Sequence, residues 1–214
     1  MRKRMVSAAL ALCLALTLFS GTALAAGQHP FTDVPQSHWA NEAVGYVYEN
    51  DLMNGVSATM FQPGGSLTRA MFVTILGRMA GAEEESGESG FADVPAGSWY
   101  APYVNWAAAN GIVNGTSATT FDPNGQITRE QLAAILYRYT AKYAPDATGN
   151  AASLADYPDA GSVSAYARDA MAWAVGNGLI KGLPHDKTDY LEPGGSTTRA
   201  QVATILMRYK QATA

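Results

Sequence analysis

The chain has 214 residues, of which 48% are hydrophobic and 15% are charged. This composition supplies enough apolar surface for a folded core and excludes a disordered or collagen-like chain. The 18 acidic residues outnumber the 14 basic ones, which gives a net charge of −4 with histidine neutral. An excess of negative charge argues against a nucleic-acid partner.

Residues 1–26 have the three parts of a secretory signal peptide. Three basic residues at positions 2–4 precede an apolar run from Met5 to Phe19, and small residues lead to Ala26. The run is shorter than the roughly 20 apolar residues that a membrane span needs, which favours cleavage and export over anchoring. Cleavage leaves 11 basic and 18 acidic residues, a net charge of −7, and removes Cys13, the single cysteine. We therefore expect a mature chain with no membrane span, disulfide or cysteine-bound metal.

The rest of the chain repeats itself three times, and a repeat determines the architecture. Phe31-Thr32-Asp33-Val34-Pro35 recurs sixty positions later as Phe91-Ala92-Asp93-Val94-Pro95, and Tyr157-Pro158-Asp159 opens a more diverged third copy. The copies span residues 31–81, 91–141 and 156–210, with polar linkers at 82–90 and 144–150.

Each copy carries two helical patterns, which the second copy illustrates. Trp99, Tyr103 and Trp106 follow helical spacing up to Gly111, a residue suited to a left-handed helix end. A turn follows at 121–125, and a second helix is predicted from Arg129 to about Ala141, with its apolar residues on one face. The third copy has three extra residues within 183–190, which we place in a loop. A two-helix unit of about 50 residues buries too little surface to be stable alone, so we expect one shared core around a pseudo-threefold axis.

These landmarks together resemble the S-layer homology family. There are five shared features: an aromatic-x-Asp opening, an aromatic residue one turn into the first helix, Asn-Gly-(Ile/Leu) before a second glycine, Phe-x-Pro-x-Gly at the turn, and Thr-Arg at the head of the second helix. They cover residues 31–210. The resemblance implies a mostly all-α fold in which three helix-loop-helix repeats form a three-pronged spindle. It also implies an exported, non-enzymatic protein of the cell wall or S-layer. Such a protein uses no cofactor and binds a secondary cell-wall polysaccharide, often with pyruvylated sugars, without a covalent bond.

The family's Thr-Arg-Ala-Glu motif is incomplete in every copy: it stands as Thr68-Arg69-Ala70-Met71, Thr128-Arg129-Glu130-Gln131 and Thr198-Arg199-Ala200-Gln201. Threonine at the helix N-cap and Glu or Gln three residues later form a capping box, in which each side chain binds the other residue's backbone N–H. The second and third copies therefore keep the box. Met71 cannot complete it, so the first copy is expected to have a weaker helix start.

Arg69, Arg129 and Arg199 are the leading candidates for ligand binding. A cation at the first helical position opposes the helix dipole, so a functional role explains it better than helix stability does. Free N–H groups at the helix start and a planar guanidinium together suit a carboxylate such as a pyruvyl ketal. The alternative is a structural arginine that forms an ion pair with an aspartate of a neighbouring repeat: Asp33, Asp93 or Asp159.

Three further sets of equivalent residues are candidates for the same groove. Trp39, Trp99 and Tyr166 either fill the core, which aromatic burial favours, or offer a ring face to a sugar. Polar residues that precede glycines could line the groove through a closely approaching backbone, and these pairs are Asn54 with Gly55, Asn114 with Gly115 and Lys181 with Gly182.

Other polar residues give no sign of catalysis or metal binding. We interpret Asp33, Asp93 and Asp159 as caps or turn formers, because each follows an aromatic residue and precedes a turn. His29, His38 and His185 occupy non-equivalent positions without metal-ligand spacing, so we expect no metal site.

The favoured interpretation is a cell-envelope anchoring module that binds an anionic wall polysaccharide in grooves between the repeats. A structural surface protein that self-associates or recruits a protein partner is the alternative, and a wall-active enzyme is a remote one, because the sequence has no nucleophile–base signature. The chain ends at Ala214, soon after the third copy, and we therefore expect no further domain.

Overall fold

The computed structural model describes residues 28–82 and 90–213. The predicted signal peptide and most of the first linker lie outside the described residues. The elements are α1 (Asn41–Glu49), α2 (Arg69–Ala80), α3 (Ala101–Ala109), α4 (Arg129–Tyr143), α5 (Arg168–Gly176), α6 (Arg199–Ala212), β1 (Leu183–His185), β2 (Thr188–Tyr190) and three short 3-10 turns at Pro145–Thr148, Ala160–Ser162 and Ala165–Ala167. The mostly helical fold predicted from the sequence is confirmed.

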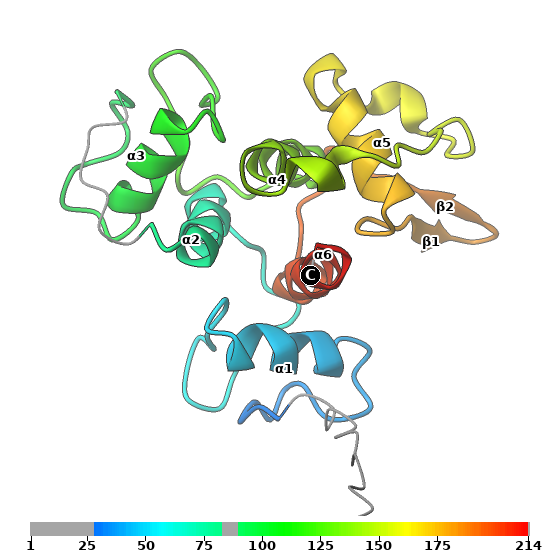
Figure 1. The fold of residues 1–214 in the computed structure, drawn as a ribbon. Coiled ribbons are helices and arrows are strands. Elements are labelled where there is room, and N and C mark those ends of the chain that lie inside the picture. The colour runs from blue at the N-terminus through cyan, green and yellow to red at the C-terminus, as the bar shows by residue number, and fades with distance from the viewer. Residues whose placement is uncertain (1–27, 83–89, 214) are drawn as a thin grey trace, which may run out of the picture.

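The long helices α2, α4 and α6 lie at the centre, and the short helices α1, α3 and α5 lie outside them (Figure 1). The two helices of one repeat are not the main packing partners. Instead α3 packs on α2, α5 packs on α4, and α1 packs on α6. Each short helix therefore rests on the long helix of the preceding repeat, and the first repeat closes on the last.

One hydrophobic core includes residues from all three repeats. Phe72, Leu132 and Val202 occupy the same position of the three long helices, and all three are fully buried. The apolar stripes predicted on these helices thus face a common centre. A shared core is the physical solution for units that bury too little surface alone.

A ring of three backbone hydrogen bonds ties the repeats together just before the long helices. The N–H of Leu67 donates to Thr197, Thr197 to Ile127, and Ile127 to Leu67, at N–O distances of 3.2, 3.0 and 3.0 Å. Each donor and acceptor comes from a different repeat, so the ring requires all three.

The helix ends follow the local sequence. Gly111 has a φ of 68°, as expected for a left-handed helix end. The capping box is complete at Thr128 with Gln131 and at Thr198 with Gln201. At α2 only the Thr68 hydroxyl caps the helix, by accepting from the N–H of Met71 at 3.2 Å. The predicted weakness of the first repeat's capping is confirmed in its geometry.

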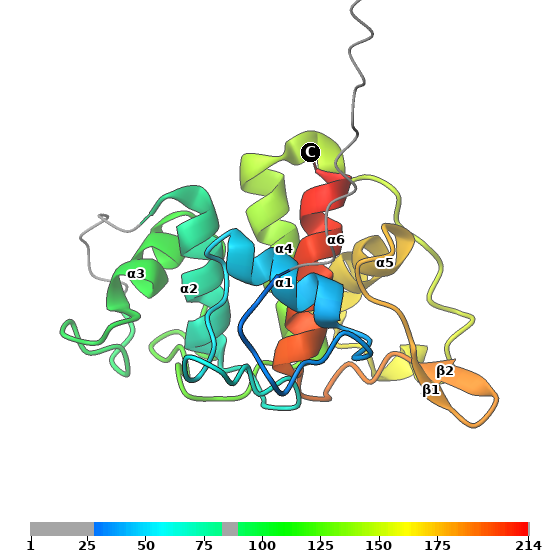
Figure 2. The same cartoon turned by 90° about the horizontal axis from the view of Figure 1, so that it is seen from below.

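Two segments predicted as loop or linker have regular structure. The stretch at 144–150 contains the Pro145–Thr148 turn, and the Trp173 indole donates to Ala147 at 2.8 Å, which fixes this turn on α5. The extra residues of the third repeat form the antiparallel hairpin β1–β2, in which Leu183 pairs with Tyr190. The hairpin projects from the body of the molecule (Figure 2).

Among residues 28–82 and 90–213, every helix is too short or too polar to cross a bilayer.

Candidate functional site

The aspartates that open the repeats bind the turn that precedes the long helix. The Asp33 carboxylate accepts from the N–H groups of Phe61 and Gln62 at 2.9 and 2.7 Å. Asp93 binds Phe121 and Asp122, and Asp159 binds Leu191 and Glu192, in the same way. The predicted structural role is confirmed, although the bound turn lies about 30 residues downstream rather than next to the aspartate.

Burial alone would raise the pKa of Asp33, but the N–H groups of Phe61 and Gln62 outweigh it and lower the pKa below its ordinary value. The pKa of Asp93 is lowered in the same way, by the N–H groups of Phe121 and Asp122. These carboxylates are charged at neutral pH and belong to the scaffold.

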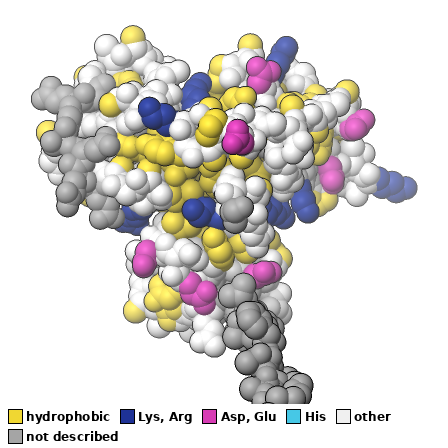
Figure 3. Space-filling view, viewed as in Figure 1, with side chains coloured by type: hydrophobic (Ala, Val, Ile, Leu, Met, Phe, Trp, Pro, Cys, Tyr) yellow, Lys and Arg dark blue, Asp and Glu magenta, His cyan; other side chains and the backbone are white. Residues whose placement is uncertain are grey.

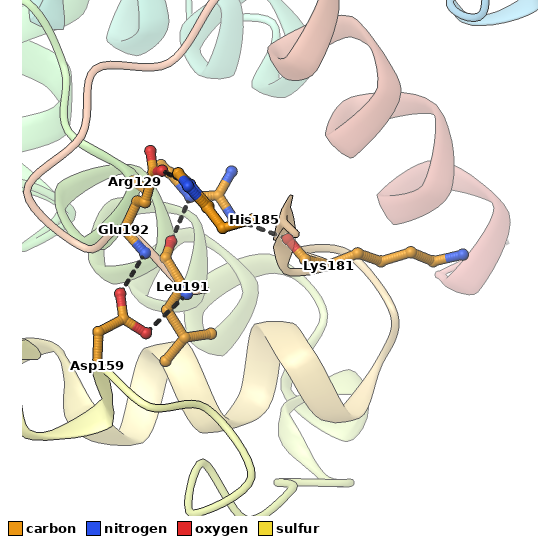
Figure 4. A network of polar contacts seen from close by, with 6 residues as sticks. All are labelled: Arg129, Asp159, Lys181, His185, Leu191 and Glu192. Carbon is orange, nitrogen blue, oxygen red and sulfur yellow. Dashed lines mark hydrogen bonds and ion pairs between the residues drawn. The ribbon is translucent and has the colours of Figure 1, made fainter. Parts of the chain in front are cut away.

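The arginine at the head of each long helix reaches the turn of the next repeat. Arg69 Nε donates to Phe121 O at 2.8 Å, and Arg199 Nε donates to Phe61 O at 2.7 Å. The third contact runs from Arg129 Nε to Leu191 O at 2.6 Å (Figure 4). In each case one turn residue makes both contacts: its N–H donates to the aspartate, and its carbonyl oxygen accepts from the arginine. The aspartate, the turn and the arginine therefore form one hydrogen-bonded network across the boundary between repeats.

Two of the three arginines make a second bond. A terminal nitrogen of Arg129 donates to Lys181 O at 2.8 Å, and one of Arg199 donates to Asn54 O at 2.6 Å. The guanidinium of Arg69 lies 4.7 Å from the Phe121 ring centroid and that of Arg199 lies 4.4 Å from Phe61. The ion pair considered as the structural alternative does not form: within residues 28–82 and 90–213 the one ion pair joins His185 to Glu192. The arginines bind carbonyl groups instead.

The prediction of free N–H groups at these helix starts is wrong. The N–H groups of Arg69 and Ala70 donate to Gly125 O and Pro123 O at 2.9 and 3.0 Å, and the other two helices repeat this pattern. The third N–H of each helix donates to the capping threonine. The turn of the next repeat fills these positions, so the backbone N–H groups of the helix starts are not available to a ligand.

A cavity lies between the repeats beside each of these arginines. Groove A, of about 380 Å³, contains Arg69, Asn114, Gln131, Arg138 and Tyr166. Groove B, of about 420 Å³, contains Arg129, Trp39, Lys181, Gln201 and Arg208. Groove C, of about 150 Å³, contains Arg199, Asn54, Met71, Arg78 and Trp99. Each groove has its floor in one repeat, its arginine from the preceding repeat and its aromatic residue from the following one.

The preference for core packing of the three aromatic residues is wrong. Trp39, Trp99 and Tyr166 are 66%, 58% and 53% exposed. Each lies two residues before the start of a short helix, and the short helices lie on the outside of the molecule. Tyr166 is held in place, because its hydroxyl donates to Glu130 Oε1 at 3.1 Å. Burial together with the Glu130 charge raises the pKa of Tyr166 to about 12.

The loop residues Asn54, Asn114 and Lys181 line grooves C, A and B. Gly115 and Gly182 also line their grooves, whereas Gly55 is not part of the lining described for groove C. The glycines have a packing reason of their own. A Cβ on Gly55 would lie 2.4 Å from Phe31, and one on Gly115 would lie 2.7 Å from Phe91.

A second arginine in each groove was not predicted as a site residue. Arg78, Arg138 and Arg208 lie on the long helices nine positions after the first arginine and line grooves C, A and B. Their equal spacing in the three repeats was the available signal. It identifies them as equivalent, but only the packing shows that they face the cavities.

The grooves concentrate positive charge on an acidic chain. Seven arginines follow residue 27, and six of them line the three grooves, whose linings contain no Asp or Glu among the described residues. Burial lowers the pKa of Arg69, Arg129 and Arg199, but a guanidinium stays protonated at neutral pH. On the face seen in Figure 3, hydrophobic side chains gather near the middle, and several basic side chains lie around them.

The described residues contain no cluster of three or more His, Cys, Asp or Glu side chains able to hold a metal ion. Each groove brings together two arginine side chains, at least one side-chain amide and one exposed aromatic ring.

Sequence comparisons agree with this architecture. The S-layer homology domain matches residues 30–71, 90–133 and 156–203. The chain is 34% identical over 178 residues to an endoglucanase of Bacillus sp. (strain KSM-635), an alignment that covers 83% of this chain and 18% of that enzyme. It is 33% identical to the surface-layer 125 kDa protein of Lysinibacillus sphaericus, covering 80% of this chain and 14% of that protein. With the S-layer protein sap of Bacillus anthracis it shares 27% identity, covering 86% and 22%.

The chain spans less than a quarter of the length of each of these relatives, and the aligned part is the part that carries the repeats. An enzyme and two surface-layer proteins thus share the same segment with it. The chain therefore belongs to the S-layer homology domain family, carries three of its modules in tandem, and is an exported protein of the cell surface.

Proposed function

We propose that the three modules anchor the protein to the cell wall by binding an anionic wall polysaccharide non-covalently in grooves A, B and C. We give the name lobe to each pair of a short helix and the long helix of the preceding repeat on which it packs. We also propose that the three lobes form the pseudo-threefold, three-pronged spindle implied by the family. The cyclic packing of α1 on α6, α3 on α2 and α5 on α4 supports this arrangement. The alignment with the endoglucanase covers 18% of that enzyme, so we assign its reaction to the part outside the modules and none to this chain.

The main support for this proposal is the position of the arginines in the grooves. A chain with more acids than bases has no long-range attraction for a polyanion, and exposed charges are screened over about 8 Å at physiological salt. Recognition must then be local, and grooves lined by two arginines and no acid provide it. The first arginine of each groove is oriented by its carbonyl bonds. Arg69 uses only Nε, whereas Arg129 and Arg199 also use one terminal nitrogen, which leaves at least one terminal nitrogen of each for a carboxylate. A pyruvyl ketal on a sugar supplies that carboxylate.

The exposed aromatic rings explain how the sugar part of the polysaccharide would be bound. Trp39, Trp99 and Tyr166 each lie in a groove beside the cations. The apolar face of a pyranose ring packs on such a side chain and removes apolar surface from water. A sugar with a carboxylate thus meets both kinds of group in the same groove.

The test is retention on purified cell wall, with and without chemical removal of pyruvyl groups. The triple variant Arg78→Gln, Arg138→Gln and Arg208→Gln should lose retention, while each single variant should lose it in part, because three weak sites on one polymer act together. Arg168→Gln, the one arginine after residue 27 outside the grooves, is the matched control. Unchanged retention after pyruvyl removal would overturn the carboxylate account, and equal complete loss in every single variant would contradict three cooperating grooves.

Light scattering of the mature protein tests the alternative function. A self-associating structural protein would form large particles without any polysaccharide, whereas the proposed anchor stays monomeric until the polymer is added.

A further inference from the structure

We propose that the β1–β2 hairpin is a specificity element of groove B, which makes this groove bind a longer segment of the anionic polysaccharide than groove A or C does. The inference rests on the proposed function and extends it to one groove. It concerns a part of the chain that the first two repeats lack.

The hairpin marks the difference between the repeats. In repeats 1 and 2 the matching loop is a five-residue turn, in which Val56 N–H donates to Met60 O and Thr116 N–H to Thr120 O, each at 2.8 Å. In repeat 3 eight residues, 183–190, form two paired strands instead. One wall of groove B is therefore longer than its counterparts.

The hairpin is held at both ends of its base. Arg129 donates to Lys181 O, just before β1, and to Leu191 O, just after β2. Asp159 holds the N–H groups of Leu191 and Glu192, and His185 of β1 bonds to Glu192 (Figure 4). With both ends fixed and the strands paired, the wall is organised before a ligand arrives, which lowers the entropy cost of binding.

The first two residues of β1 line the groove. Leu183 and Pro184 line groove B together with Trp39 from the first repeat. Groove B is also the largest of the three, at about 420 Å³ against about 380 and 150 Å³. Trp39 is 66% exposed, so its ring is available to a ligand.

The charges near this wall define the ligand class. Lys181 adds a third cation to Arg129 and Arg208, and no acid lines the cavity. Figure 4 shows the Lys181 side chain pointing away from Arg129, so the two cations do not compete for one anionic group. Groove B thus fits a glycan segment with anionic groups spaced along it and an apolar ring face against Leu183, Pro184 and Trp39.

The experiment replaces residues 183–190 with the Thr-Ser-Ala-Thr-Thr loop of residues 116–120. The background carries Arg78→Gln and Arg138→Gln, which disable grooves C and A and prevent one fragment from bridging two grooves. Calorimetry measures the dissociation constants of wall-polysaccharide fragments of one, two and three repeating units. The intact hairpin should give an affinity that rises with fragment length, and the replaced loop should lose about tenfold for the longer fragments, as expected for about 55 Å² of lost apolar contact. Affinity for the single unit should stay the same.

Two point variants guard against misfolding of the replaced loop. Leu183→Ser removes the apolar contact and should reproduce most of the loss, whereas Lys187→Ser, in the turn of the hairpin outside the groove lining, should not. Circular dichroism and the melting temperature report on the fold of each variant. If the length dependence survives in the replaced-loop and Leu183→Ser variants, the hairpin proposal is wrong while the anchoring function stands. If no fragment and no intact polymer binds the unmodified protein, both fail.

Discussion

At the scale of single residues, Arg69, Arg129 and Arg199 repeat one geometry, in which the same side chain binds the scaffold and lines a groove. Arg69 uses one guanidinium nitrogen for a carbonyl of the next repeat, and Arg129 and Arg199 use two. The rest of each guanidinium lines a groove. From the sequence alone, a structural arginine and a ligand-binding arginine are alternatives. The planar guanidinium has five donors, so one side chain can fill both positions.

Replacing Arg129 with methionine tests the structural half of this role. The change leaves Leu191 O and Lys181 O without their donor, and the free energy of unfolding should fall by about 1–3 kcal/mol. Arg69→Met removes one hydrogen bond, to Phe121 O, instead of two, so it should lower the free energy of unfolding by less than Arg129→Met does. Urea denaturation gives both values, and Lys142→Met on the exposed end of α4 should change stability by less than about 0.5 kcal/mol. Equal losses of stability in all three variants would contradict a specific role of the arginine–carbonyl hydrogen bonds.

The aspartates at the start of the repeats make the stability of the fold depend on pH in the acid range. The pKa values of Asp33 and Asp93 are lower in the folded protein than their ordinary value of 3.8. The unfolded chain therefore binds the proton first, so the stabilisation is present above pH 3.8 and is lost as the pH falls through the folded pKa.

We expect the melting temperature to decline as the pH falls below about 4, and Asp93→Asn should flatten this decline. Differential scanning calorimetry across the acid range measures it. Asp146→Asn, at an exposed position, should leave the slope unchanged, and a wild-type slope in Asp93→Asn would refute the assignment.

At the scale of elements, the long helices show how far local sequence determines structure. Threonine at the cap and glutamine three residues later give complete boxes at α4 and α6, and methionine gives half a box at α2. These bonds connect residues three positions apart, and the sequence was therefore sufficient to predict them.

Met71→Gln should complete the box at α2. Met71 is already 37% exposed, so its replacement removes little buried surface. The added bond to the Thr68 N–H should raise the free energy of unfolding by about 0.5–1 kcal/mol. The reverse change, Gln131→Met, should lower it by a similar amount in the same denaturation experiment. A destabilised Met71→Gln protein would show that Met71 serves groove packing rather than being a tolerated substitution.

At the scale of the whole molecule, each short helix packs on the long helix of a different repeat. Because α1 packs on α6, the first and last repeats are linked by contacts that span most of the chain, including Arg199 to Asn54 and Phe61. The ring of Leu67, Thr197 and Ile127 closes the same circle at the backbone. No single repeat contains a complete lobe.

A fragment of residues 28–150, which lacks the third repeat, should fail to unfold cooperatively. It leaves α1 without α6 and α4 without α5, and it breaks the backbone ring. Circular dichroism during heating would show a broad, weak transition. Adding residues 151–213 as a separate peptide should restore a sharp one by supplying α5 and α6. A sharp transition in the shorter fragment alone would mean that each lobe is independently stable.

The sequence by itself determined the three repeats, the six helices, the threonine caps of the three long helices, and the family, because these depend on residue types at short and regular spacings. Only the tertiary structure decided that the helices exchange partners, that the helix N–H groups are occupied, that Trp39 and its equivalents are exposed, and that Arg78, Arg138 and Arg208 face the grooves. The physical reason is distance along the chain. The hydrogen bonds from the arginines to carbonyl groups join residues 52 to 145 positions apart. Local periodicity contains no information about which distant carbonyl or ring a side chain will contact.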